Sequence, residues 1–323
     1  MMNPRSARTS LVSSFRPVSE DPPTALALAR AAIRSRNDPE SETAPFLSAV
    51  ERDVLGGAAS GVLRTDGGQT TGIALWNQST PTGLTVEVLH LVAPYQTSER
   101  YREFYREIGT RVGPVSFAPG HLAGLAGDDE DRLMRSLAFE RFERSEMRYP
   151  VGAPDPTAFP VDRLRGLEGS DEPGLARLHE VAYRGQLDRF LFQVDPEPTR
   201  DAEIQVREIL SGRWGPSLPW ASFVVATDEA IAAASLVVRA PYGPLIADVM
   251  VEPTRQGQGL GRAVLVASVR ALRGRGESTV VLNVTEGNAR AIRLYERTGF
   301  VRSVGPSHGW YSTERIPLVR PAP

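Results

Sequence analysis

The sequence predicts an α+β (mixed α/β) protein with two similar domains, and three observations support this prediction. The chain has 323 residues, which is more than one ordinary domain needs. A proline-rich stretch at residues 150–160 separates two segments of comparable size and is typical of a linker. In the second segment, β-prone runs alternate with amphipathic runs, which indicates helices packed on a sheet.

The elements of the second segment are expected in a fixed order. A short strand (164–167) precedes two helices (171–184 and 202–210). Three β-prone runs follow at residues 222–227, 231–239 and 245–251, with turns between them. A helix ending at Arg273, a strand (280–284), a helix (289–297) and two final extended segments complete the order.

A glycine-rich turn follows the third of the β-prone runs, where residues 251–262 read V-E-P-T-R-Q-G-Q-G-L-G-R. Gly257, Gly259 and Gly261 allow positive φ and a close approach of the main chain to an anion. The first N–H groups of the next helix lack intrahelical partners and point toward such an anion. The turn therefore predicts a pyrophosphate site. The chain has no lysine, which an ATP-binding loop needs to reach the terminal phosphate. The G-x-G-x-G spacing differs from the G-x-G-x-x-G of a dinucleotide-binding loop.

A second motif covers residues 288–300, which read N-A-R-A-I-R-L-Y-E-R-T-G-F. Asn288 can cap a helix, and Ile292 and Tyr295 lie one helical turn apart. Gly299 supplies the left-handed residue that ends the helix before Phe300 begins an extended segment. This motif predicts a short capped helix between two strands.

The two motifs together resemble the acetyl-CoA motifs of the GCN5-related N-acetyltransferase (GNAT) superfamily. The matching patterns are Q-x-x-G-x-G at Gln256–Gly261 and N-x-x-A-x-x-x-Y-x-x-x-G-F at Asn288–Phe300. The resemblance implies an N-acetyltransferase with acetyl-CoA as the acyl donor. It also implies a mostly antiparallel mixed sheet, flanked by helices, whose fourth and fifth strands splay apart.

The first segment repeats this order, so the chain resembles a tandem GNAT protein. A β-prone run at 85–92 ends in Val-Ala-Pro94 as the run at 245–251 ends in Val-Glu-Pro253, and a helical run at 98–112 follows. The sequence Tyr95–Arg100 replaces the glycine turn. Counting back from Phe139 and Phe300, three positions differ: Gly127 stands for Asn288, Met134 for Tyr295 and Ala138 for Gly299.

These departures define the expected domains. We expect residues 1–24 to be poorly ordered and residues 25–150 to form a degenerate GNAT-like domain without a CoA loop. Residues 151–162 are expected to be a linker, and residues 163–323 the catalytic GNAT domain. The first domain would then be a structural or substrate-shaping partner.

The resemblance also implies which residues form the cofactor site. Main-chain groups of Val249, Met250 and Val251 would bind the pantetheine arm, and an N–H near Met250 or Val251 would polarise the thioester oxygen. The N–H groups of the glycine turn would hold the pyrophosphate, and Arg262 would add positive charge. The residues of this turn are Gln256, Gly257, Gln258, Gly259, Leu260 and Gly261.

Two residues of the second motif have alternative roles. Asn288 contacts the CoA arm in the family, or it only caps its helix, and both can hold at once. Tyr295 is the candidate catalytic residue, as a general acid toward the departing sulfur. Alternatively, its ring only packs on the cofactor.

The general base is not identified by the sequence. Asn283 stands where some family members carry a glutamate, and an amide cannot accept the proton. Asp248, Glu286 or a chain of waters are the alternatives, although alternation places Asp248 on the strand face opposite Val249 and Val251. His179, Asp188 and His308 lie in segments that line acceptor sites in the family, and residues 183–194 are expected to set acceptor specificity.

Composition excludes several other classes of function. The chain has no cysteine, so disulfides, thiolate metal sites and a cysteine nucleophile are excluded. His90, His121, His179 and His308 show no metal-ligand spacing, and we expect no metal. A net charge of −2 does not favour nucleic acid, and no apolar run is long enough for a membrane span or a secretory signal, so we expect a cytoplasmic protein.

The leading hypothesis is therefore an acetyl-CoA-dependent N-acetyltransferase. It would transfer the acetyl group to a primary amine of a small molecule by direct attack in a ternary complex. One alternative is an acyltransferase resembling mycothiol synthase, which is also a tandem GNAT protein. The other is a non-catalytic sensor or interaction protein that binds acyl-CoA without turnover.

Overall fold

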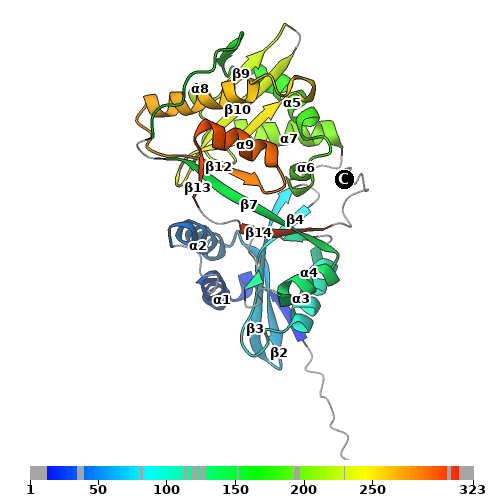
Figure 1. The fold of residues 1–323 in the computed structure, drawn as a ribbon. Helices are drawn as coiled ribbons and strands as arrows, with labels where there is room; N and C mark the ends of the chain where they lie inside the picture. Colours follow the sequence, from blue (N-terminus) through cyan, green and yellow to red (C-terminus); the bar gives the residue numbers. More distant parts are fainter. Residues whose placement is uncertain are drawn as a thin grey trace, which may run out of the picture. The chain divides into compact units, whose positions relative to one another are not determined.

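A computed structural model of the chain describes residues 13–34, 40–80, 83–112, 115–117, 122–123, 128–150, 153–192, 197–228, 230–303 and 307–312. These residues form two compact units. The first is built from the chain up to Ser79, from Gly83–Arg141 and from a segment that begins at Gly309, and the second mainly from Phe142–His308. Both are mixed α/β structures, as expected (Figure 1).

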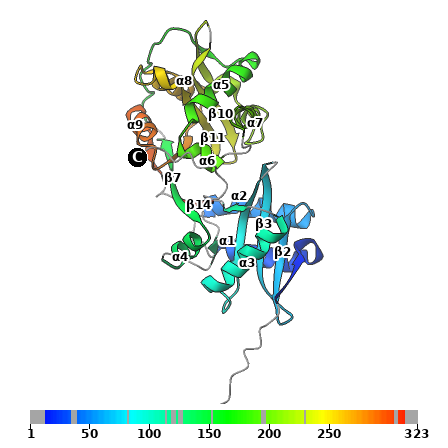
Figure 2. The same ribbon diagram turned by 90° about the vertical axis from the view of Figure 1, so that its right-hand side faces the viewer.

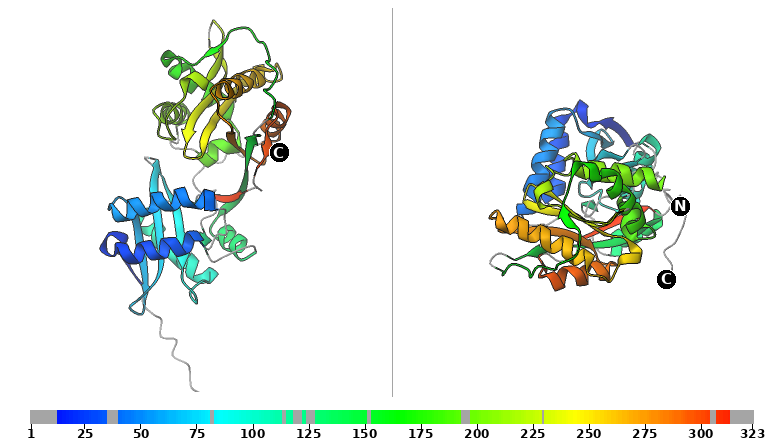
Figure 3. Two further views of the ribbon diagram at one scale, coloured as in Figure 1. Left: turned by 90° about the vertical axis from the view of Figure 1, so that its left-hand side faces the viewer. Right: turned by 90° about the horizontal axis from the view of Figure 1, so that it is seen from above.

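The first unit has a sheet in the order β1-β2-β3-β4-β5, with β6 also paired to β4. Helices α1 (Pro22–Arg34) and α2 (Glu40–Leu55) run side by side over one face (Figure 3), and α3 (Ser98–Val112) and α4 (Asp128–Ser136) cover the other (Figure 2). The strands are β1 (Ser13–Pro17), β2 (Ser60–Asp66), β3 (Gln69–Thr80), β4 (Gly83–Leu91), β5 (Val115–Phe117) and β6 (Leu122–Ala123).

The expectation that residues 1–24 lack order is wrong for residues 13–24. Strand β1 pairs with β2 from Ser13 to Pro17, and Pro22 begins α1. The Ser13 hydroxyl also donates to Asp66 at 2.7 Å. These partners lie far along the chain, and the local composition gave no sign of them. Residues 1–12 lie outside the described ranges.

The elements predicted for the second segment occur in the predicted order, and all of them except the last extended segment lie in the second unit. Helices α5 (Glu172–Tyr183) and α7 (Pro198–Leu210) pack on one face of its sheet, and α8 (Leu260–Gly274) and α9 (Ala289–Thr298) on the other. A short helix, α6 (Leu187–Phe192), follows α5. The strands are β8 (Leu164–Gly166), β9 (Phe223–Ala226), β10 (Ile231–Ala240), β11 (Gly243–Val251), β12 (Val280–Thr285) and β13 (Val301–Arg302).

Strands β11 and β12 splay apart, as expected for the fourth and fifth strands of the domain. They are parallel and pair only at Leu245↔Val281 and Ile246↔Leu282. Strand β11 continues to Val251 along β10, which contains a bulge between Leu236 and Val237. Within the described ranges, the edge of β11 beyond Ile246 therefore has no strand beside it on the β12 side.

Strand β7 (Phe139–Tyr149) comes before the proline-rich stretch, yet it lies in the sheet of the second unit, between β12 and β13. It pairs with β12 at six positions, from Val280↔Tyr149 to Thr285↔Arg144. Strand β12 is thus held along its length by β7 after it has left β11. The second compact unit includes these residues of β7, whereas the expected catalytic domain began after the linker.

A strand near the end of the chain contributes, in turn, to the first unit. Trp310, in β14 (Ser307–Ser312), is 2% exposed and belongs to the core of the first unit. Its indole N–H donates to Glu130 at 3.1 Å. Each compact unit therefore contains residues from beyond its own half of the sequence.

A matching turn supports the internal repeat. Gly299 ends α9 with φ of 106°, and Ala138, at the corresponding place after α4, has φ of 60°. A left-handed conformation is unusual for a residue with a Cβ. The first half therefore has the same left-handed turn after its helix, although alanine replaces glycine at this position. None of the helices in the described ranges combines the length and hydropathy that a bilayer crossing requires.

Candidate active site

A cavity of about 1190 Å³ lies in the second unit, and the splayed ends of β11 and β12 contribute to its wall. Every residue that the sequence analysis assigned to the cofactor lies in its lining. They are Val249, Met250, Val251, Gln256, Gly257, Gln258, Gly259, Leu260, Gly261, Arg262, Asn288 and Tyr295. Residues more than 40 positions apart thus line one space.

The glycine turn presents main-chain N–H groups to this cavity. Gly257 and Gly259 both have φ of 82°, and Gly259 is the N-cap of α8. The first hydrogen bond of the helix runs from the N–H of Ala263 to the carbonyl of Gly259, at 3.0 Å. Among the described residues, the N–H groups of 257–262 have no main-chain acceptor. They are therefore available to an anion.

Close packing brings the start of α8 against β11. A Cβ on Gly261 would lie 3.1 Å from Cγ2 of Val251 and 3.3 Å from Cδ2 of Leu294. Next to it, the Nε of Arg262 is buried and has no hydrogen-bond partner among the described residues. A buried guanidinium N–H without an acceptor fits a site that takes an anionic group. The residues present thus fit a pyrophosphate.

Helix α9 places Asn288 and Tyr295 in the same lining. Asn288 caps the helix, since its Oδ1 accepts the N–H of Ala291 at 3.0 Å. Tyr295 is buried, and burial raises the pKa of its phenol well above the usual range. The charges of Asp248 and Asp188 act in the same direction. The phenol is therefore protonated at neutral pH and can donate a proton.

The side of the cavity formed by α5 and β11 holds a buried carboxyl group. Asp248 is 6% exposed, and the Tyr183 hydroxyl donates to its Oδ1 at 2.5 Å. Burial raises the pKa of Asp248 to about 7, and the hydrogen bond from Tyr183 opposes this rise. Nε2 of His179 lies 3.9 Å from Oδ2 of Asp248, and burial lowers the pKa of His179 to about 4. His179 is therefore neutral at pH 7.

A second carboxyl group, that of Asp188 on α6, lies near the end of β12. Its Oδ1 accepts the hydroxyl of Thr285 at 2.5 Å. Arg144 of β7 lines the same region, and burial lowers the pKa of its guanidinium while the charge of Asp188 opposes this effect. A residue encoded before the proline-rich stretch therefore contributes charge to the cavity.

Other acceptor-side candidates have different surroundings. Glu286 is hydrogen-bonded by Arg302 and by Ser145, and the bond from Arg302 lowers the pKa of its carboxyl group. Neither Glu286 nor His308 is part of the described cavity lining, whereas Asn283 is. From the expected specificity segment, Tyr183, Gln186, Asp188 and Arg189 line the cavity. The side chains of Phe190 and Phe192 and residues 193–194 lie outside the description.

Several residues of the lining were not proposed from the sequence, among them Arg144, Phe159 and Thr285. Asp248 was named only as one alternative for the base, with strand alternation as the argument against it. Alternation along β11 turns Asp248 and Val249 to opposite faces, and both residues line the cavity. Among the described side chains, no group of three or more His, Cys, Asp or Glu is placed to bind a metal ion.

The corresponding place in the first unit is built differently. At the start of α3, Oγ1 of Thr97 accepts the N–H of Arg100 at 3.3 Å. At the end of β4, the N–H of Leu91 donates to the hydroxyl of Tyr101 at 3.2 Å. Strand β4 is also paired along its length, with β5 at 84–86 and with β6 at 89–90. The N-terminus of α3 and the edge of β4 therefore have protein partners, unlike the corresponding main-chain groups at α8 and β11.

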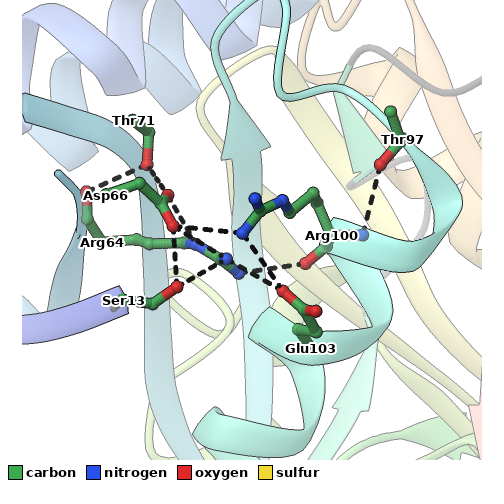
Figure 4. Close-up of polar contacts among 7 residues, drawn as sticks. All are labelled: Ser13, Arg64, Asp66, Thr71, Thr97, Arg100 and Glu103. Carbon is green, nitrogen blue, oxygen red and sulfur yellow. Dashed lines mark hydrogen bonds and ion pairs between the residues drawn. The ribbon is translucent and has the colours of Figure 1, made fainter. Parts of the chain in front are cut away.

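An ion-pair network occupies the region between β2 and α3 (Figure 4). Arg64 is fully buried and donates to Asp66 at 2.9 Å and to Glu103 at 3.0 Å. Arg100 also donates to Asp66, at 3.2 Å. Arg100 stands where the second half has Gly261, so the first half uses this position for an ion pair.

Comparison with known proteins identifies relatives of the second half and of the whole chain. Residues 186–300 match the acetyltransferase (GNAT) family. Mycothiol acetyltransferase of Salinispora tropica is 30% identical over 255 residues, which cover 74% of this chain and 77% of that protein. Three further mycothiol acetyltransferases match over 52 residues only, which is 15% to 18% of their own length.

Solved structures share the fold over nearly the full chain. A GCN5-related N-acetyltransferase from Sphaerobacter thermophilus has a TM-score of 0.61 and 17% identity, covering 92% of this chain and 95% of that chain. A tandem GNAT protein from the clavulanic acid biosynthesis pathway has a TM-score of 0.55 and 14% identity, covering 93% of this chain and 98% of that chain. These likenesses show the tandem fold.

Proposed function

Because the chain belongs to the acetyltransferase (GNAT) family, we propose that it is an acetyl-CoA-dependent N-acetyltransferase acting on a primary amine of a small molecule. One observation carries the proposal. A protonated phenol, Tyr295, and a carboxyl group with a pKa near 7, Asp248, line the same cavity as an anion-binding turn. Acetyl transfer to an amine uses a base for the amine and an acid for the departing thiolate, and the turn would hold the pyrophosphate of the donor.

Acetyl-CoA supplies an activated acetyl thioester, and the chain supplies its binding groups. The N–H groups of 257–262 and the unpartnered Nε of Arg262 are placed to hold the pyrophosphate. The free edge of β11 beyond Ile246 offers main-chain groups of Val249, Met250 and Val251 to the pantetheine arm. Asn288, at the cavity wall, is proposed to contact this arm in addition to capping α9.

We assign the two proton transfers to Asp248 and Tyr295. Asp248 accepts the proton of the acceptor's ammonium group, which leaves the amine nitrogen free to attack the acetyl carbon. Tyr295 donates its phenolic proton to the departing sulfur, and the second proton that the nitrogen loses as the amide forms restores the phenol. A base with a pKa near 7 is half ionised at neutral pH, which is the range in which general bases are most effective.

The first unit is proposed to be non-catalytic. The three groups that serve the cofactor in the second unit are a free helix N-terminus, a free strand edge and a glycine turn. In the first unit Thr97 caps the helix, Tyr101 occupies the N–H of Leu91, and β5 and β6 cover β4. The position of Gly127, which stands for Asn288, lies outside the described ranges.

A second candidate function is favoured by the named relatives. The Salinispora tropica protein is a mycothiol acetyltransferase, and its match covers most of both chains. This chain would then acetylate the amine that is the precursor of mycothiol. Both candidates place the reaction in the same cavity and differ only in the acceptor. As partners we propose a small-molecule amine, with neither nucleic acid nor membrane, and as location the cytoplasm.

The proposal is tested by measuring release of the CoA thiol from acetyl-CoA with a panel of small amines. The panel includes the amine precursor of mycothiol, simple alkyl amines, amino sugars and diamines. We expect amine-dependent thiol release and a matching acetylated product by mass spectrometry. Tight binding of acetyl-CoA without thiol release for any amine would instead support a non-catalytic acyl-CoA sensor.

A further inference from the structure

The proline-rich stretch is tied along helix α8 at several points. We call residues 153–160 the strap. The hydroxyl of Tyr149 donates to the carbonyl of Pro154 at 2.6 Å. Arg273 donates to Asp155 at 2.6 Å, and Arg270 donates to the carbonyl of Pro156 at 3.2 Å. The strap thus runs from the C-terminal end of α8 toward its N-terminal end.

The strap ends at the glycine turn. A Cβ built on Gly259 would lie 2.3 Å from Cε1 and 2.5 Å from Cζ of Phe159, so this ring lies directly against the turn. The guanidinium of Arg262 lies 5.1 Å from the centroid of the same ring. Phe159 is half-buried and lines the cavity. The ring is therefore part of the cavity wall at the phosphate-binding end.

The chemistry of this corner suits the nucleotide end of a ligand. Arg262 offers a buried Nε–H without a partner among the described residues, and the ring of Phe159 holds its guanidinium by a cation–π contact. An aromatic face beside a phosphate-binding turn is a combination that favours a nucleobase, because bases stack on aromatic side chains. The pantetheine-binding edge of β11 is formed by other residues.

We propose that the strap completes the cofactor site, with Phe159 as a binding residue for the nucleotide end of CoA and as the residue that positions Arg262 toward the pyrophosphate. This inference rests on the proposed function for the identity of the cofactor. It gives the proline-rich stretch a role in binding, beyond that of a linker. It also explains why Gly259 must lack a side chain.

The test compares ligands with and without the nucleotide. Affinities of CoA and of pantetheine for the full-length protein are measured by calorimetry, for the natural chain and for Phe159→Ala. We expect Phe159→Ala to bind CoA about tenfold more weakly, in the range of base–aromatic stacking. Pantetheine, which has no nucleotide, is expected to bind both proteins equally.

A matched control lies at the other end of α8. The guanidinium of Arg275 lies 3.9 Å from the ring centroid of Trp220, which is not part of the described cavity lining. Trp220→Ala removes the same kind of contact and is expected to leave the CoA affinity unchanged. Phe159→Leu keeps an apolar side chain on the turn and serves if Phe159→Ala unfolds, which circular dichroism would show.

Two results would overturn the inference alone. CoA affinity of Phe159→Ala or Phe159→Leu equal to that of the natural chain would show that the ring does not bind the nucleotide. An equal loss for CoA and pantetheine would show that the ring only supports the cavity as a whole. If the natural chain bound no CoA, the proposed function would fail as well, so the two failures are distinguishable.

Discussion

The phenol of Tyr183 donates a hydrogen bond of 2.5 Å to the carboxyl group of Asp248. This contact joins the last residue of α5 to the middle of β11, at the point where β11 has separated from β12. The partner is a hydroxyl group, so it lowers the pKa of Asp248 less than burial raises it. Asp248 therefore has a pKa in the range in which it can exchange protons with an amine at neutral pH.

Replacing Asp248 by Asn should remove the base. Since the base must be ionised, the kcat/KM of the natural chain is expected to rise with pH through about 7. In Asp248→Asn this rise should be absent and kcat should fall about 100-fold or more. Tyr183→Phe removes a hydrogen bond that lowers the pKa, so it should move the rise to higher pH.

A control for this pH profile is Asp228→Asn, because Asp228 is 84% exposed and pairs with Arg163. It should leave the profile unchanged. Steady-state kinetics between pH 5.5 and pH 9 with an acceptor from the amine panel would decide. A pH dependence in Asp248→Asn identical to that of the natural chain would refute the assignment.

Asp248→Asn should also increase the stability of the protein at alkaline pH. A carboxyl group whose pKa rises from its usual value of 3.8 to about 7 on folding binds more protons in the folded state between these values. The free energy of unfolding then falls as pH rises from about 4 to about 7, and stays reduced above. Asp248→Asn should be more stable than the natural chain at pH 8, by up to about 4 kcal/mol.

Thermal or urea unfolding at two pH values tests this prediction. The difference in stability should disappear near pH 4, where both side chains are neutral. Equal stability of the two proteins at pH 8 would contradict the raised pKa. A stabilising substitution in a site that loses activity is the expected trade-off for a buried functional carboxylate.

The two left-handed glycines of the glycine turn should respond differently to alanine. Both have φ of 82°, so each alanine costs about 1–2 kcal/mol of backbone strain. A Cβ on Gly257 meets nothing within 4 Å, whereas one on Gly259 collides with Phe159. Gly259→Ala should therefore weaken CoA binding at least tenfold more than Gly257→Ala. Equal losses in calorimetric titrations would show that the ring of Phe159 moves away freely.

The buried ion pair of the first unit should be essential for its stability. The Asp66 side chain has no exposure and holds the buried Arg64, as well as Arg100 (Figure 4). Asp66→Ala leaves the Arg64 guanidinium without its main partner and should cost about 3–5 kcal/mol. Glu103→Ala is the control, because Glu103 is 50% exposed, and should cost about 1 kcal/mol or less. Similar unfolding midpoints for the two variants would contradict this ranking.

The residues that we propose for the cofactor could be brought together from sequence, because main-chain binding imposes side-chain requirements at short range. Gly257 and Gly259 supply left-handed residues, Gly261 permits close packing, and Asn288 caps α9. Such requirements recur at fixed spacing and are visible without a structure. The same holds for the alternation of helices and strands in the second half, which the structure confirms.

The side of the cavity that we propose for the acceptor could not be predicted in this way, because it depends on long-range pairing. Arg144 reaches the cavity only because β7 pairs with β12, and nothing in residues 139–149 indicates that partner. Alternation placed Asp248 on the strand face opposite Val249 and Val251, whereas the cavity lining contains all three residues. Phe159 belongs to a stretch whose composition predicted a linker, although specific contacts tie that stretch to α8.

Replacing Tyr295 by Phe tests the central claim most directly, since only the phenolic oxygen is removed from the cavity. The measurement is the kcat of acetyl transfer together with the affinity for acetyl-CoA. We expect kcat to fall about 100-fold, in the range of general acid catalysis, while the affinity stays the same. A Tyr295→Phe protein that acetylates the amine at the rate of the natural chain would contradict the proposed mechanism.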